Sequence, residues 1–116
     1  MSGTAIYYWT QHSKAKMAYY KLSESRVRRV INSPMRVEEG IAPDTVAYMQ
    51  PVSYKTKNGE KTWNQELWVM LAKNDKKEAK HKVRIISAWR YPGMTKSRES
   101  LPRAILDEIR EALNSY

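Results

Sequence analysis

The chain of 116 residues predicts a single α+β domain, on three observations. The stretch Lys82–Tyr91 is β-branched and apolar at consecutive positions and stops at Pro92-Gly93, which indicates a strand buried on both faces. Two short helical patterns and a series of strand patterns precede it, and an amphipathic helical pattern follows it. Because compact domains commonly contain about 100–150 residues, we expect residues 1–116 to form one unit.

Two helices are predicted near the N-terminus, after a short aromatic strand over residues 5–9. Thr10 or Ser13 offers an N-cap for the first helix, which should run through about Tyr20. Ser23 offers an N-cap for the second helix, which should end near Asn32, just before a Ser-Pro pair. The apolar side chains predicted to form the buried face of the first helix recur three or four apart: Ala15, Ala18, Tyr19 and Leu22.

Strand patterns fill residues 35–72, and Asn58-Gly59 is the strongest local signal among them. A type I′ hairpin turn requires positive φ at both central residues, which favours an Asn-Gly pair. The second arm of this hairpin should run over residues 61–72. We expect its later half, residues 67–72, to pair antiparallel with residues 83–88, so the predicted sheet is small, twisted and antiparallel.

A C-terminal helix is predicted over residues 100–114, with Ser100 as its N-cap. Pro102 fits its first turn, where a missing N–H is tolerated. Apolar residues recur every four positions along it: Leu101, Ile105, Ile109 and Leu113. Leu106 and Ala112 widen this apolar stripe. We expect this stripe to pack on the sheet rather than on a partner.

Charge is the most informative bulk property, since 21 Lys and Arg against 12 Asp and Glu give a formal net charge of +9. A small domain so far from neutrality favours a polyanionic partner, either nucleic acid or an acidic protein. With no cysteine and only two histidines, a metal site is not expected, and no glycine-rich loop indicates a phosphate-bearing cofactor. We expect no cofactor, no membrane segment and a cytoplasmic location.

The N-terminal third carries a series of short motifs in order: His12-Ser-Lys-Ala-Lys-Met17, Tyr20-Lys-Leu22, and Asn32-Ser-Pro34 before the first long strand pattern. This series resembles the opening of a family of bacterial domains of unknown function that begin with a His-Ala-x-x-Arg-Met helix. Those domains are similar to the RelE and BrnT toxins of toxin–antitoxin systems, and Val83–Tyr91 resembles a BrnT strand of the form Arg-Ile-Ile-Ser-Ala-Arg. Lys16 stands where the family usually has arginine, and Tyr20-Lys21 replaces its usual Arg-Gly. The resemblance implies a RelE-like fold to which the C-terminal helix is an addition.

RelE-like proteins cleave RNA by attack of the 2′-hydroxyl on the adjacent phosphate, so the resemblance implies a metal-independent endoribonuclease. That reaction needs a base, an acid and cations around the phosphate. His12 is the candidate base or acid, with Lys16, Arg84 and Arg90 around the phosphate. Alternation places Arg84 and Arg90 on one face of their strand.

Two other functions stay open. The first is a non-catalytic nucleic-acid-binding module, whose backbone contacts would come from basic residues, with Tyr91 as a stacking platform: Arg26, Arg29, Lys73, Lys76, Lys77, Lys80 and Lys82. The second is a basic domain that binds an acidic, antitoxin-like protein.

Overall fold

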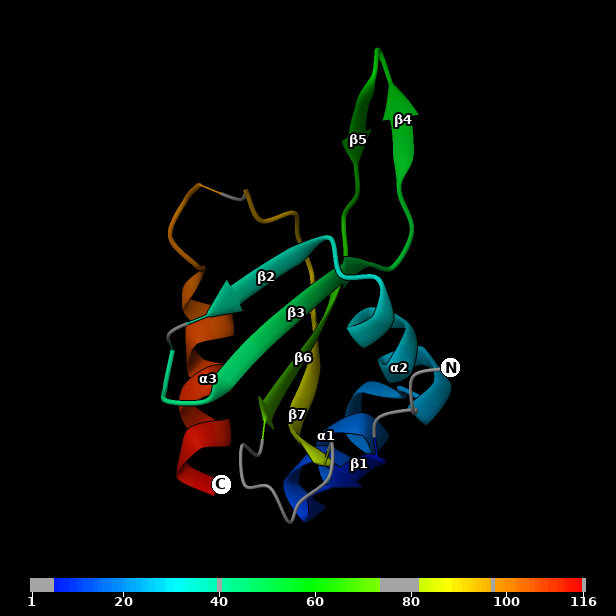
Figure 1. Cartoon of the computed structure of the whole chain (residues 1–116). Coiled ribbons are helices and arrows are strands. Elements are labelled where there is room, and N and C mark those ends of the chain that lie inside the picture. The colour runs from blue at the N-terminus through cyan, green and yellow to red at the C-terminus, as the bar shows by residue number, and fades with distance from the viewer. Residues whose placement is uncertain (1–5, 40, 74–81, 97, 116) are drawn as a thin grey trace.

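The structure, a computed structural model, describes residues 6–39, 41–73, 82–96 and 98–115. These residues form an α+β fold in which a five-stranded sheet is covered by helices, while a separate two-stranded hairpin projects from one end (Figure 1). The elements are, in chain order, β1 (Ile6–Trp9), α1 (Gln11–Tyr20), α2 (Glu24–Asn32), β2 (Arg36–Glu39), β3 (Thr45–Pro51), β4 (Lys55–Lys57), β5 (Glu60–Thr62), β6 (Glu66–Lys73), β7 (Lys82–Tyr91) and α3 (Arg103–Ser115).

The sheet has the order β1-β7-β6-β3-β2. The predicted antiparallel pairing of β6 with β7 is confirmed, and β7 is apolar on both faces, with Ile85, Ile86 and Ala88 all buried. The expectation of a purely antiparallel sheet is wrong, because β1 runs parallel to β7. No tight turn joins these two strands, so the local sequence does not determine their relative direction.

Both N-terminal helices begin where the sequence predicts. The side chains of Thr10 and Ser23 accept hydrogen bonds from the backbone N–H groups three residues ahead. Of the predicted buried face, Leu22 is buried, but Ala15, Ala18 and Tyr19 are exposed, and Ser13 and Met17 are the buried residues within α1. The reason is the position of α1, whose N-cap residue Thr10 bonds to the Ile85 carbonyl of β7 through its N–H and its hydroxyl.

The Asn58-Gly59 hairpin is confirmed, with φ of 53° at Asn58 and 81° at Gly59. Its arms, β4 and β5, are exposed along their whole length and project from the body of the molecule (Figure 1). The predicted long second arm is interrupted at residues 63–65, where the chain leaves the hairpin and enters β6. The hairpin is therefore an arm attached to the sheet at the ends of β3 and β6.

A β-bulge in β7 changes which side chains share a face. Met70 pairs with Ser87, but the next residue of β6, Leu71, pairs with Ile85, so Ile86 has no residue opposite it. Residues on one side of the bulge therefore point to the face opposite the one that simple alternation from the other side predicts. Arg84 lies opposite Ala72 and Arg90 opposite Leu67, which belong to the cores on opposite faces of the sheet. The expectation that the two arginines share a face is wrong.

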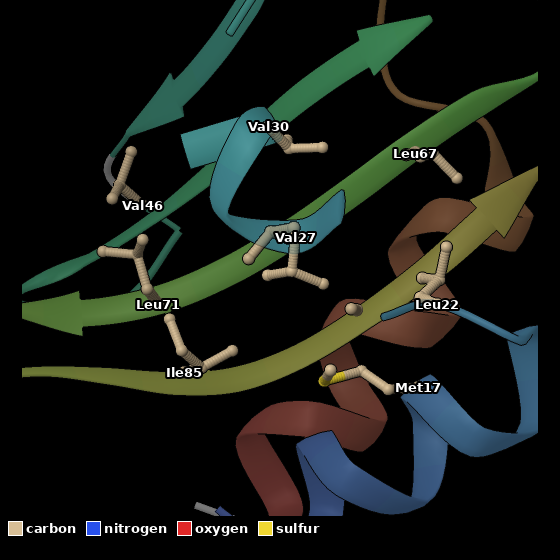
Figure 2. Close-up of a cluster of buried hydrophobic side chains, with 10 residues drawn as sticks. Met17, Leu22, Val27, Val30, Val46, Leu67, Leu71 and Ile85 are labelled. Atoms are coloured by element: carbon tan, nitrogen blue, oxygen red, sulfur yellow. The ribbon is translucent and has the colours of Figure 1, made fainter. Parts of the chain in front are cut away.

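Two apolar cores lie on the two faces of the sheet. In the first, side chains of α1 and α2 converge on the strands, as Figure 2 shows for Met17, Val27 and Ile85. In the second, α3 packs on the other face through Ile105, Ile109 and Ala112, which confirms that this helix belongs to the core. The prediction of Ser100 as N-cap is wrong, because α3 begins at Arg103 and its first backbone bonds go to the carbonyl of Pro102. Leu106 is also 42% exposed rather than part of the stripe.

Candidate nucleic-acid interface

His12 and Lys16, two of the four predicted catalytic residues, lie between α1 and α3. The Nζ atom of Lys16 is 2.8 Å from Glu108 Oε1 and 2.8 Å from Glu111 Oε1. Burial by itself lowers the pKa of Lys16, but the hydrogen bonds with these two carboxylates raise it to about 12. The bond from Lys16 lowers the pKa of Glu111. His12 Nε2 lies 3.7 Å from the same Glu111 oxygen, so both predicted residues face carboxylates of α3.

The two predicted arginines lie apart from this cluster and from each other. The guanidinium of Arg84 lies 5.6 Å from the centre of the Tyr8 ring, on the face of the sheet that carries α3. Arg90 lies on the face that carries α1 and α2, where its Nε donates to the Tyr20 carbonyl at 2.7 Å. The structure thus brings His12 and Lys16 together but does not join them with the arginines in one site.

The residues predicted to hold a phosphate backbone are also dispersed. Lys76, Lys77 and Lys80 lie outside the described residues, and Lys82 begins β7. Lys73 lines a depression together with Glu39 and Asp44, so two carboxylates share its surroundings. Tyr91 is partly buried against the core beneath α3. Arg26 and Arg29, by contrast, lie side by side on a basic surface.

This basic surface consists of three depressions around the base of the β4–β5 hairpin. The first has a volume of about 500 Å³ and lies between α2 and the end of β3. The second and third have volumes of about 360 Å³ and about 280 Å³. Met35 lines both the first and the second, Tyr54 both the first and the third, and Trp63 both the second and the third. The three adjoin one another at these shared residues, and we call them together the hairpin trough.

Cations line every part of the hairpin trough, and no described residue in its lining is an aspartate or glutamate. Its lysines and arginines come from α2, β2, both arms of the hairpin and the segment after β7: Arg26, Arg29, Arg36, Lys55, Lys61 and Lys96. Arg36 is paired with Glu38 at 2.7 Å, and Lys96 lies 4.0 Å from Glu99. In the part of the chain that the structure describes, Arg26, Arg29, Lys55 and Lys61 have no ion pair.

Arg26 is held in place without its charge being neutralised. Its guanidinium donates to the Gln50 side chain and to the Pro51 carbonyl, which are neutral acceptors. Burial, followed by repulsion from Arg29 and Arg90, lowers the pKa of Arg26. An anion bound beside these three arginines would relieve that repulsion.

Two aromatic side chains accompany the cations. Tyr54 is 51% exposed, and the Nζ of Lys61 lies 4.7 Å from the centre of its ring. The indole N–H of Trp63 donates to Glu66 Oε2 at 2.8 Å. Glu66 is fully buried and also accepts from the Trp68 indole and from Thr95.

Sequence reasoning found only two members of the trough, Arg26 and Arg29. Lys55 and Lys61 could have been found from their positions on either side of the Asn-Gly turn, because a projecting hairpin exposes all its side chains. The contribution of Met35 and Lys96 had no such signal, because it depends on loops that meet only in the folded chain.

No protein-family model, curated protein or solved structure matches this chain. Among the described residues, none of the helices has the length and apolar character needed to span a membrane. The same residues contain no cluster of three or more His, Asp or Glu side chains placed to bind a metal ion.

Proposed function

We propose that this protein binds nucleic acid, with RNA as the preferred polymer, and that the hairpin trough holds its backbone. The observation that carries the proposal is a set of three adjoining depressions lined by six cations, four of them without an ion pair, and by no carboxylate among the described residues. Lysines and arginines that face phosphates release condensed counterions, which supplies most of the affinity of a sequence-tolerant nucleic-acid binder. The aromatic rings of Tyr54 and Trp63 add surfaces on which bases stack.

The choice of RNA comes from the resemblance to the RelE and BrnT toxins, and a RelE-like fold and a cytoplasmic location belong to the same proposal. RNA cleavage is not part of it. A general base must reach its proton at hydrogen-bond distance, with cations around the same phosphate. His12 and Lys16 lie beside Glu111, whereas Arg84 and Arg90 lie on opposite faces of the sheet.

Binding can be tested with a short fluorescent RNA, with fluorescence anisotropy measured at several salt concentrations. We expect the affinity to fall steeply between about 50 and 200 mM salt. Arg29→Gln and Lys61→Gln should each weaken binding, whereas Arg103→Gln removes the same charge from α3 and should not.

Equal effects of the three substitutions would refute the trough as the binding surface and leave only a response to net charge. An acidic polypeptide that binds as tightly as RNA, with the same dependence on Arg29 and Lys61, would instead favour an antitoxin-like protein partner.

A further inference from the structure

The second depression of the hairpin trough differs in chemistry from the first. Its lining is dominated by three methionines and one indole: Met35, Met49, Met94 and Trp63. Met49 is buried, whereas Met35 and Met94 are each 41% exposed. We call this depression the methionine pocket. Its volume of about 360 Å³ lies within the range of small-molecule sites, which is about 300–1,000 Å³.

We propose that the methionine pocket holds one unstacked base of a single-stranded nucleic acid, an inference that rests on the proposed function. Thioether groups are polarizable and make favourable contacts with aromatic rings, and their side chains adapt to rings of different shape. The pocket therefore fits the apolar faces of a flat ring. It selects for an exposed base rather than for a particular one.

Two buried side chains, the Glu66 carboxylate and the Arg36 guanidinium, hold the walls of the pocket by hydrogen bonds. Glu66 accepts from the Trp63 indole at 2.8 Å and from the Thr95 backbone N–H at 2.6 Å, so one carboxylate ties together two walls. On the other side, Arg36 donates to the Lys96 carbonyl at 3.1 Å and joins β2 to the segment after β7. A pocket formed in advance of binding loses less conformational entropy when a ligand enters.

Charge identifies the ligand class. Met35 lines both the methionine pocket and the first depression of the hairpin trough. In that first depression Arg26, Arg29 and Lys61 have no ion pair within the described parts of the chain. A ligand that extends across Met35 must therefore present a flat ring on one side and a negative charge on the other. A nucleotide within a single strand has this arrangement. In a duplex, each base is stacked and paired, so entry would cost the unstacking of a base pair.

Affinity should therefore depend on bases as well as on phosphates. We would measure binding to three ligands of equal length: a single-stranded RNA, the same sugar–phosphate backbone without bases, and an RNA duplex. Wild-type protein should bind the base-bearing strand about fivefold or more tightly than the abasic strand, since each base stacked on an aromatic surface contributes at least that factor. The duplex should bind more weakly than the single strand.

Met94→Ala should reduce this base-dependent ratio by about threefold or more, and Met94→Leu should restore part of it. Leu106→Ala is the matched control, because Leu106 is 42% exposed but lies on α3 outside the trough. Methyl resonances give a second measurement. On addition of adenosine monophosphate those of Met35 and Met94 should shift, whereas that of the buried Met17 should not.

Equal affinity for the base-bearing and abasic strands would refute the base pocket and leave the proposed function intact. Tighter binding of the duplex than of the single strand would refute it as well. Absence of binding to all three ligands would refute both proposals. Displacement of the strand by an acidic peptide that shifts the same methionine resonances would assign the pocket to a protein side chain and overturn the inference.

Discussion

Glu66→Gln should destabilise the protein, because Glu66 connects the pocket walls to the core. Its side chain is fully buried at the start of β6. One carboxylate oxygen accepts from the Trp68 indole at 2.9 Å, and the other accepts from the Trp63 indole and the Thr95 backbone N–H. The Thr95 hydroxyl lies 2.9 Å from the second oxygen. The described surroundings of this carboxylate thus supply only hydrogen-bond donors.

Glutamine keeps one acceptor oxygen and places an NH2 group where the other stood. At least one buried N–H then faces another donor, and an unsatisfied buried donor costs about 1–3 kcal/mol. The remaining bonds lose the extra strength that a charged acceptor provides. Removal of a buried charge offsets part of this loss, so we expect a net destabilisation of about 2–3 kcal/mol. For a domain of this size, that lowers Tm by roughly 10 °C.

Urea unfolding followed by tryptophan fluorescence measures this difference directly. Glu60→Gln is the control, since Glu60 lies in β5 on the exposed hairpin, where substitutions usually change stability by less than about 0.5 kcal/mol. Equal stability of the two variants would mean that the carboxylate does not organise the pocket walls.

Three further outcomes are expected. In anisotropy measurements, the magnitude of the slope of log K for binding single-stranded RNA against log salt should decrease by about 0.7 in Arg29→Gln, because one phosphate contact is lost. The slope should stay unchanged in Arg103→Gln. The pKa of Lys16 is raised from 10.5 to about 12, and that of Tyr20 from 10.0 to about 12. The stability that these groups contribute is fully present below their unfolded pKa values and is lost as the folded groups deprotonate, so Tm should fall between pH 10 and 12. In calorimetric scans Lys16→Met should reduce this fall, and it should leave RNA affinity intact. RNA incubated with the protein and a metal chelator should stay full-length on a gel, and cleavage that His12→Ala abolishes would show that a site assembles on binding.

Local chemistry made much of the fold predictable. Thr10 and Ser23 cap the helices that they were expected to cap, and Asn58-Gly59 closes its hairpin, because each signal depends only on residues a few positions away. The bulge at Ile86 had no such signal. It depends on how β7 matches β6. Because the bulge lies between Arg84 and Arg90, it places them on opposite faces, and the prediction that they share a face is wrong.

The site could be predicted only in part for a related reason. Lys16 was expected to contact phosphate, but whether a lysine is available depends on the carboxylates that the fold brings to it. The helix that carries Glu108 and Glu111 is distant from α1 in sequence and adjacent to it in space. No pattern within α1 could reveal that contact.

Ion pairs are unevenly distributed among the described cations. The acidic residues of α3 pair with Lys16 of α1 and, through Asp107, with Arg103 and Arg110 of α3 itself. Cations near α3 are therefore largely neutralised. Those around the base of the hairpin, on α2 and on β5, have no carboxylate in the described lining of their depressions. Arg26, Arg29 and Lys61 thus produce a local positive field around the base of the hairpin. Because this field lies beside the methionine pocket, the ligand that we propose is a single-stranded polyanion with exposed bases rather than a duplex or an acidic protein.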